Sequence, residues 1–257
     1  MSTTSATIAI CIITYIAFGA FLYLVQTNAI FQPDNTNFNA CSTFKDSQKV
    51  VHNGTRMYYT NHSDTLVIVF HGNAGAACDR SALKSILDNN DVSTLFVEYT
   101  GYSGDTQKPS SAAILKNADD AAAFAKSLAP KKIIILSESI GSGPATYLAK
   151  ENPHKIILMT PFSRLSDLTQ SKYPIYPTKL LLKHSFDNIH ALQNYTGALV
   201  SIHGTNDTII PIKFSNRLLD AANTVSAKKL YTIEGAGHNN LLHYQQTINA
   251  LNEELKG

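Results

Sequence analysis

Ser139 is the residue of this sequence whose setting best suits nucleophilic chemistry. It lies in the turn Ser137-Glu138-Ser139-Ile140-Gly141, which follows an apolar run and precedes a helix-like segment. A serine hydroxyl is a weak nucleophile unless a tight strand-to-helix turn exposes its Oγ beside a base and beside free backbone N–H groups. Such a turn needs small residues two positions before and two positions after the serine. Frames centred on Ser137 or Ser142 put isoleucine at one of these positions, so the spacing favours Ser139.

Asp207 and His238 follow Ser139 along the chain and supply the other groups that this chemistry needs. A histidine must take the serine proton, and a carboxylate must hold that histidine in the correct tautomer. Asp207 ends the polar turn 204–207, and His238 ends the segment Gly235-Ala236-Gly237-His238. Standing alone, Asp207 is typical of an Asx turn and His238 of a helix entry or a surface position. In this order after Ser139 they predict a Ser-His-Asp triad, with His243 as the reserve candidate for the base.

Backbone N–H groups must also stabilise the negative oxygen that forms when a serine attacks a carbonyl carbon. The N–H of Ile140 is one expected donor, because it lies at the positively polarised start of the helix after Ser139. The second is expected from the loop His71-Gly72-Asn73-Ala74-Gly75, with Asn73 as the first choice and Ala74 as the second. The structural alternative for this loop is a glycine-rich strand-to-helix turn.

The elements that must position these residues alternate between buried strands and helices. Apolar strands are expected at 65–70, 94–99, 133–136, 156–159, 198–202 and 230–233, after an edge hairpin around 56–60. Helices are expected at about 77–87, 111–128, 141–152, 212–222 and 239–255. This alternation predicts an α/β fold with a mostly parallel sheet covered by helices on both faces. Sites in such sheets lie beyond the carboxyl ends of the strands, and every candidate residue above follows a strand end.

Taken together, these motifs resemble the α/β-hydrolase superfamily and, more narrowly, the membrane-anchored serine hydrolases of the bud-emergence-related type. The matching stretches are the five motifs around residues 71–75, 98–102, 137–141, 204–207 and 237–239, the start Phe31-Gln32-Pro33, and an insert from Thr160-Pro161-Phe162-Ser163 to Phe186-Asp187. Two positions depart from the group, because Ser137 replaces the usual glycine and Glu98 the usual aspartate. The resemblance implies an α/β-hydrolase fold with a small cap insert at about 161–197.

The segment Ile8–Val25 is apolar and uncharged, and no charged side chain occurs before Asp34. About 20 such residues match the hydrocarbon thickness of a bilayer, whereas the cores of signal peptides run about 7 to 15. We therefore expect a single-pass N-terminal membrane anchor in residues 1–30, followed by a hydrolase domain in residues 31–257. A cleaved signal peptide ending at Thr27-Asn28-Ala29 is the alternative. The sequence leaves open which side of the membrane the domain occupies.

Composition excludes several other classes of function. The net charge of +2, with no basic cluster, argues against nucleic-acid binding. The glycine runs lack the spacing of nucleotide-binding loops, and no histidine-carboxylate cluster has metal-ligand spacing, so no cofactor and no metal are expected. Cys11, Cys41 and Cys78 form no CxxC pair, and a disulfide between Cys41 and Cys78 stays open. We expect a monomer.

The expected activity is hydrolysis of a carboxylic ester or thioester through an acyl-serine intermediate, with an acyl lipid or an acylated protein as substrate. The alternatives are a serine peptidase of the prolyl-peptidase type and a catalytically inactive hydrolase fold that acts as an interaction module. Apolar residues of the insert either line an acyl groove or pack the insert onto the body. These residues are Phe162, Tyr173, Ile175, Tyr176, Leu180, Leu181 and Leu182.

Overall fold

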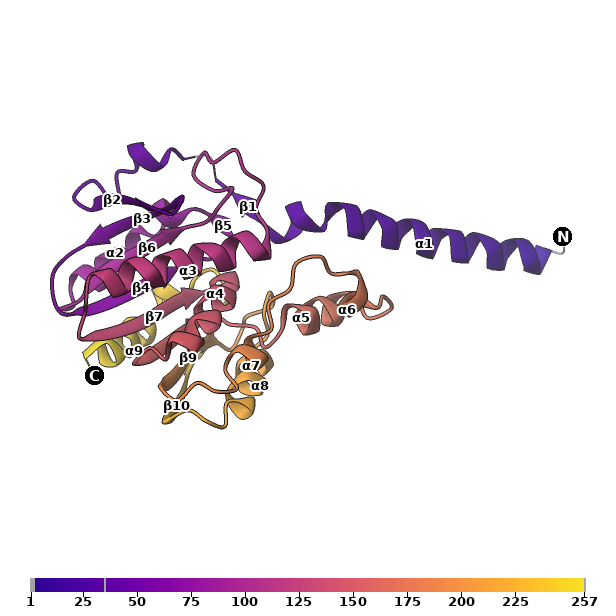
Figure 1. Cartoon of the computed structure of the whole chain (residues 1–257). Coiled ribbons are helices and arrows are strands. Elements are labelled where there is room, and N and C mark those ends of the chain that lie inside the picture. Colours follow the sequence, from indigo (N-terminus) through magenta and orange to yellow (C-terminus); the bar gives the residue numbers. More distant parts are fainter. Residues whose placement is uncertain (1–2, 35, 257) are drawn as a thin grey trace.

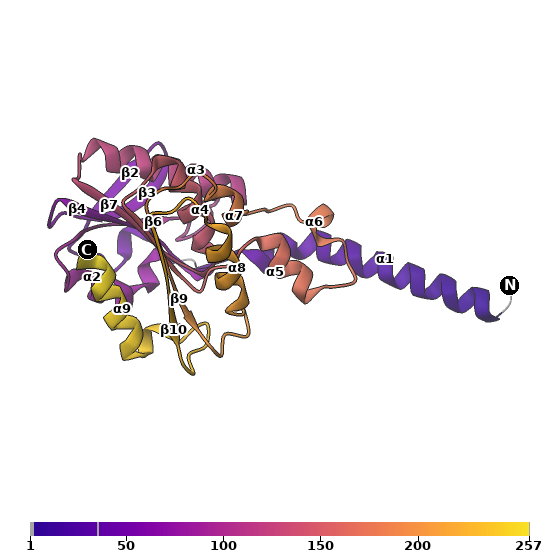
Figure 2. The same cartoon turned by 90° about the horizontal axis from the view of Figure 1, so that it is seen from below.

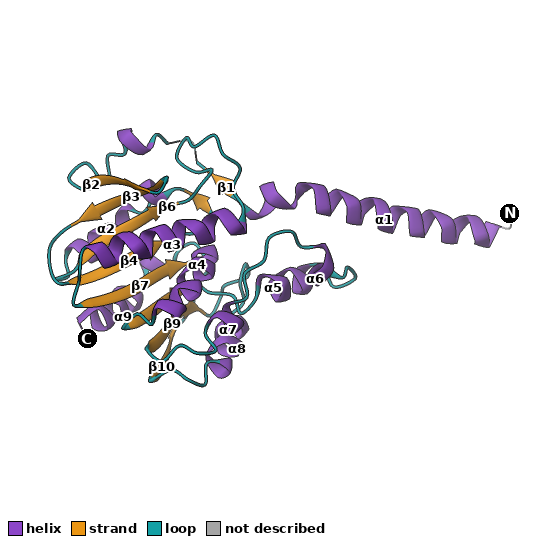
Figure 3. Ribbon diagram, in the orientation of Figure 1, coloured by secondary structure: helices purple, strands orange, loops and turns teal. Residues whose placement is uncertain are grey.

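A computed structural model describes residues 3–34 and 36–256 of the chain, and its centre is an eight-stranded sheet (Figure 3). The strand order is β10-β9-β8-β7-β4-β6-β3-β2. The strands are β2 (Gln48–His52), β3 (Thr55–Thr60), β4 (Thr65–Phe70), β6 (Ser93–Glu98), β7 (Lys132–Glu138), β8 (Lys155–Met159), β9 (Ala198–Gly204) and β10 (Ala227–Ile233). Pairing is antiparallel between β2 and β3 and between β3 and β6, and parallel in every other pair of this sheet.

Helices cover both faces of the sheet, as the alternation of apolar strands and helices predicts (Figures 1 and 2). Helices α3 (Ser111–Ser127), α4 (Ser142–Tyr147) and α8 (Lys213–Ala221) bury apolar side chains in the core on one face. Helices α2 (Ser81–Asp88) and α9 (Gln245–Lys256) contribute to the core on the other face. Because both faces are covered, the central strands are almost continuously apolar and buried.

Several predicted elements differ at their ends from the observed ones. The segment 141–152 is one predicted helix, but the chain forms a 3₁₀ turn η3 (Ser139–Gly141), α4, and a second 3₁₀ turn η4 (Leu148–Glu151). The predicted final helix likewise divides into η5 (Leu241–His243) and α9. Strands β2 and β3 form the edge hairpin that is predicted around 56–60. The short strands β1 (Gln32–Pro33) and β5 (Ala74–Gly75), which pair with each other in parallel, lie outside the predicted set. Two-residue strands carry too little apolar pattern to be recognised from sequence.

Helix α1 (Thr3–Ile30) extends away from the sheet, with the N-terminus far from the body (Figure 1). It contains 28 residues and is apolar enough to cross a membrane. Its side chains are apolar all round, which is typical of a helix surrounded by lipid or protein and unusual for one in water. Among its described residues only Gly19 and Gln26 are buried.

The insert, residues 161–197, connects β8 to β9 and carries three short helices. They are α5 (Leu165–Lys172), α6 (Thr178–Leu181) and α7 (Asn188–Ala191). Helix α7 returns to the body, where Asn188 is buried and donates hydrogen bonds to Ser142 Oγ and to the carbonyl of Phe162. Helices α5 and α6 extend from the body beside α1 (Figures 1 and 2). The insert therefore contacts the body at one end and α1 at the other.

Candidate active site

Ser139 lies at the sharp turn between β7 and α4, and its backbone is in the left-handed region with φ of 53°. Only glycine and, less easily, Asn or Asp adopt this region at low cost, so the turn holds Ser139 in a strained conformation. Gly141 makes the turn sterically feasible. A Cβ on Gly141 would lie 2.4 Å from the carbonyl oxygen of Phe70 and 2.8 Å from that of His71. This is the close approach that the small-x-Ser-x-Gly pattern requires.

Ser137, which departs from the usual glycine, is accommodated inside the sheet. It pairs with Phe70 of β4 and Leu158 of β8, and its side chain is fully buried. Its Oγ has no hydrogen-bond partner among residues 3–34 and 36–256. Ser137 thus leaves the turn intact and adds one unsatisfied buried hydroxyl.

The structure brings Ser139, His238 and Asp207 into one hydrogen-bonded chain. His238 Nε2 lies 2.9 Å from Ser139 Oγ, and His238 Nδ1 lies 2.7 Å from Asp207 Oδ2. A carboxylate only accepts, so Nδ1 carries the proton and Nε2 accepts from the serine hydroxyl. His243, the reserve candidate for the base, is part of η5. The histidine that contacts Ser139 is His238.

Asp207 is held on both of its carboxylate oxygens. Oδ1 accepts hydrogen bonds from the backbone N–H groups of Ile209 and Ile210 at 2.9 and 2.8 Å, while Oδ2 faces His238 and, at 3.2 Å, His203 Nε2. Burial alone raises the pKa of Asp207. Hydrogen bonds from His203 and His238, the charge of His238 and the N–H of Ile210 outweigh burial and hold the pKa well below its ordinary value. Asp207 is therefore a carboxylate at neutral pH.

His203 also belongs to this network, although no sequence motif indicates it. It is fully buried at the end of β9, with Nδ1 at 2.6 Å from Ser215 Oγ and Nε2 at 2.7 Å from the carbonyl oxygen of Ile210. Two acceptors face Nε2, so Nε2 carries the proton and Nδ1 accepts from Ser215. The available signal was its position at a predicted strand end, directly before the turn that carries Asp207.

The loops that carry Asp207 and His238 are joined by backbone contacts. Thr205 N–H donates to the carbonyl of Ile233, and Asn206 N–H donates to that of Ala236, at 3.0 and 2.9 Å. Gly235 N–H in turn donates to Thr205 Oγ1 at 2.9 Å. These bonds follow from the parallel pairing of β9 with β10, whose carboxyl ends meet at one edge of the sheet. They fix the distance between the histidine and the carboxylate.

The loop after β4 lies against the Ser139 turn through Arg80. The Nε of Arg80 is 2.9 Å from Glu138 Oε2, and its Nη2 donates to the carbonyl of Ala74 at 2.8 Å. The side chain of Asn73 accepts hydrogen bonds from Gln32 N–H at 3.0 Å and from Tyr102 Oη at 3.3 Å. The loop that contains Asn73 is therefore tied both to the residue before Ser139 and to the segment that follows α1.

Glu98, the second departure from the hydrolase group, contacts the segment that contains the same loop. It is buried at the end of β6, accepts from Ala77 N–H and from Ser103 Oγ, and lies 3.3 Å from His71 Nε2. The ring of Tyr99 stacks on His71 with centroids 3.9 Å apart. Glutamate thus reaches the loop from a strand end, and the extra methylene is accommodated in the core.

A cavity of 180 Å³ opens beside His238. Its lining includes Arg80, Glu138, Thr160, Leu242 and His243. Charged and apolar side chains both line the cavity. Among the described residues, no group of three or more His, Cys, Asp or Glu side chains is arranged to hold a metal ion. The cavity provides space for a small group next to the His238 ring.

The chain has the α/β-hydrolase fold, as comparison with solved structures shows. An esterase of Pyrococcus furiosus superposes with a TM-score of 0.67 over 88% of this chain and 98% of its own, at 14% identity. A thermophilic esterase of Thermogutta terrifontis, with butyrate bound, gives 0.65 over 83% and 94%, at 15% identity. Est1E of Butyrivibrio proteoclasticus, with ferulic acid bound, gives 0.63 over 82% and 96%, at 17% identity. The predicted fold class is therefore confirmed.

Two sequence relatives match most of the chain at below 30% identity. An uncharacterised protein of Mycobacterium tuberculosis is 28% identical over 246 residues, which cover 90% of this chain and 87% of that protein. The α/β-hydrolase domain-containing protein 17B of Xenopus laevis is 26% identical over 189 residues, covering 71% of this chain and 63% of that protein. No protein-family model matches the chain.

Proposed function

We propose that the protein is a membrane-anchored serine hydrolase that cleaves a carboxylic ester or thioester of an acyl group. The observation that carries this proposal is the hydrogen-bonded chain from Ser139 through His238 to Asp207, on a turn with a left-handed serine. The esterase structures that share the fold, two of them with carboxylic acids bound, support it. So does the resemblance of the motifs to the bud-emergence-related hydrolases.

In this mechanism Ser139 Oγ attacks the carbonyl carbon of the substrate while His238 Nε2 takes the hydroxyl proton. Asp207 holds the histidine in its tautomer and stabilises the imidazolium that forms. The N–H groups of Ile140 and Asn73 stabilise the oxyanion. When the tetrahedral intermediate collapses, His238 gives its proton to the leaving alcohol or thiol. His238 then activates a water molecule, whose attack releases the acid and regenerates Ser139.

Helix α1 is retained in this proposal as a single-pass anchor rather than cleaved as a signal peptide. Cleavage after Ala29 would remove Gln26 and Thr27, which are hydrogen-bonded to Leu181 and His184 of the insert. It would also leave Phe31, which is buried in the core, as the second residue of the new chain. The hydrolase domain then comprises residues 31–257, with the insert as its cap.

A fluorophosphonate probe tests the nucleophile directly. We expect the probe to label the full chain, Ser139→Ala to abolish labelling, and turnover to fall by roughly 10⁴-fold or more in Ser139→Ala and His238→Ala. Ser137→Ala is the matched control, because it removes a hydroxyl two residues away and leaves Ser139 in place. Labelling that persists in Ser139→Ala would overturn the assignment, and an unlabelled native protein would favour the inactive interaction module.

Substrate profiling separates the hydrolase from the peptidase alternative. The experiment measures the rates of cleavage of acyl esters and thioesters of increasing chain length and compares them with the rates for prolyl peptides. Faster cleavage of the acyl substrates supports the proposal, and preferential cleavage of the peptides contradicts it.

A further inference from the structure

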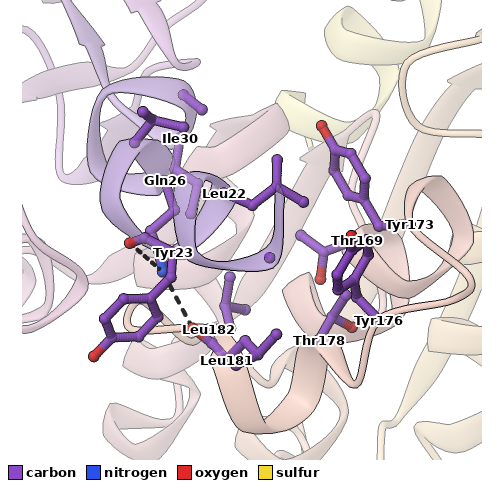
Figure 4. Close-up of a pocket in the computed structure, with 13 residues that line it drawn as sticks. Leu22, Tyr23, Gln26, Ile30, Thr169, Tyr173, Tyr176, Thr178, Leu181 and Leu182 are labelled. Atoms are coloured by element: carbon purple, nitrogen blue, oxygen red, sulfur yellow. Dashed lines mark hydrogen bonds between the residues drawn. The ribbon is translucent and has the colours of Figure 1, made fainter. Parts of the chain in front are cut away.

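Helices α5 and α6 of the insert pack along the half of α1 that is nearer the body. The rings of Tyr15 and Tyr176 stack with centroids 4.6 Å apart and planes 4° from parallel. Gly19 allows this approach, since a Cβ there would lie 2.9 Å from the ring of Tyr176. Tyr176, Leu181 and Gln26 line an apolar cavity of 110 Å³ between the two segments (Figure 4).

The polar groups at this contact bond to one another. Tyr15 Oη donates to the carbonyl of Ile175 at 2.9 Å, and Tyr176 Oη donates to the carbonyl of Tyr15 at 3.0 Å. The Gln26 amide donates to the carbonyl of Leu181 at 3.1 Å and accepts from Lys183 N–H at 2.6 Å (Figure 4 shows the bond to Leu181). Polar groups in a lipid environment need hydrogen-bond partners within the protein, because hydrocarbon has no hydrogen-bonding groups.

The position of Tyr15 within the apolar run sets the depth of the contact. Ten residues separate Tyr15 from Val25 at the end of the run, which is about 15 Å along a helix axis and about half of a hydrocarbon layer of ~30 Å. If the insert were in water, the half of α1 that it contacts would be in water too. That half exposes Phe21 at 54% and Leu24 at 74%, so such a position would leave a large apolar surface hydrated.

The tip of the insert, residues 172–183, has the composition of a membrane-facing surface. Ile175 is 70% exposed and Leu180 is 84% exposed. Each is followed in sequence by a residue that contacts α1, Tyr176 and Leu181 respectively. Lys172, Lys179 and Lys183 are also exposed, and no acidic residue occurs between Asp167 and Asp187. Long lysine side chains keep their ammonium groups at the headgroup level while their stems lie in apolar surroundings, and anionic headgroups attract them.

We propose that the tip of the insert enters the same leaflet as the adjoining half of α1, with Ile175 and Leu180 among the acyl chains and the three lysines at anionic headgroups. The partner is the lipid leaflet itself. Helix α1 and the insert then form one membrane-embedded unit, and the body of the domain is held against the bilayer on the side of the insert. This contact is separate from the chemistry of Ser139, so the labelling experiment above and the experiment below fail independently.

The absence of tryptophan from the sequence makes a single-tryptophan depth measurement direct. Leu180→Trp in the full chain is reconstituted into phosphatidylcholine–phosphatidylserine vesicles whose acyl chains are brominated or unbrominated. We expect blue-shifted emission and a loss of fluorescence in brominated vesicles. Ile175→Trp is the second variant, in case Leu180→Trp does not fold. Val51→Trp is the matched control, since Val51 is an exposed residue of the edge strand β2 and should not be quenched.

Two results would overturn the proposal. Emission from Leu180→Trp and Ile175→Trp that is unquenched and matches Val51→Trp would place the tip in water. Blue-shifted, unquenched emission that depends on the protein-to-lipid ratio would show that a second copy of the chain covers the tip instead. Adding Lys172→Gln and Lys179→Gln to the Leu180→Trp chain should weaken quenching in phosphatidylserine vesicles, and unchanged quenching would contradict the role of the lysines.

Discussion

One of the two histidine contacts of Asp207 can be predicted from the sequence and the other cannot. Its place after Ser139 and before His238 was predicted from chain order, and the structure places it within hydrogen-bond distance of His238. Its second histidine neighbour, His203, was not predicted, because no motif distinguishes one strand-end histidine from another. The contact depends on how the turn 204–207 folds back over β9.

At the scale of the residue, Asp207→Asn should destabilise the protein in a pH-dependent way. The pKa of Asp207 is lowered from its ordinary value of 3.8 in the folded protein. Its stabilising contribution is therefore fully present above pH 3.8 and is lost as the pH falls below that value. We expect Asp207→Asn to lower the free energy of unfolding by about 1–3 kcal/mol at neutral pH.

Urea unfolding of the full chain in detergent micelles, followed across pH, measures this difference. The gap between the two proteins should close as the pH falls below 3.8. Asp220→Asn on α8 is the control, because Asp220 is exposed. A gap that stays constant into the acid range would show that ionised Asp207 does not stabilise the fold.

At the scale of the element, α1 shows what composition can and cannot decide. Its apolar run, which is longer than the core of a signal peptide, favours a membrane anchor, but composition does not show what the helix contacts. The structure adds hydrogen bonds from Gln26 and Thr27 to the insert, which a signal peptide has no need to make. These contacts support the anchor that we propose.

Retention of α1 is testable on protein purified from its native membrane. We expect the mass of the intact chain to include residues 3–30, and we expect alkaline carbonate to leave the protein in the membrane fraction. Both results follow from an apolar helix long enough to span the bilayer and bonded to the insert. A mature chain that begins at Ile30 and is released by carbonate would instead support the signal peptide.

At the scale of the whole molecule, a disulfide joins Cys41 to Cys78, with Cα atoms 5.8 Å apart. It connects the segment after β1 to the 3₁₀ turn η2 (Ala77–Asp79), which follows the Asn73 loop. Disulfides persist in oxidising compartments and are rare in the cytosol. The bond therefore favours an oxidising compartment for the domain that contains Cys41 and Cys78.

Cys41→Ser should lower the free energy of unfolding by about 4 kcal/mol, the chain-entropy cost for a loop of this size, since 37 residues separate the two cysteines. Urea unfolding under non-reducing conditions measures the change. Cys11→Ser is the control, because Cys11 is exposed on α1 and unpaired. If Cys41 and Cys78 in protein from native membranes react freely with a thiol reagent, the bond and the compartment inferred from it are both wrong.

Features that depend on local pattern can be predicted from the amino-acid sequence. Apolar runs and helical periodicity indicated the parallel sheet with helices on both faces, and the short motif around Ser139 indicated the strained turn. The spacing of the small residues at 137 and 141 around Ser139 is visible along the chain, although the backbone that Gly141 approaches belongs to Phe70 and His71 at the end of β4. The order of Ser139, Asp207 and His238 added the expectation that they meet at one edge of the sheet.

Contacts between residues distant in sequence could not be predicted from local pattern. The stacking of Tyr15 on Tyr176, the bond between Cys41 and Cys78, and the contact of His203 with Asp207 all depend on how separate segments approach one another. The insert is the clearest case. Its apolar residues are expected to line a groove or to pack on the body. Phe162 does pack in the core of the body, whereas Tyr176 and Leu181 pack on α1, and Ile175 and Leu180 stay exposed. Composition specifies that a side chain avoids water, but only the fold decides what covers it.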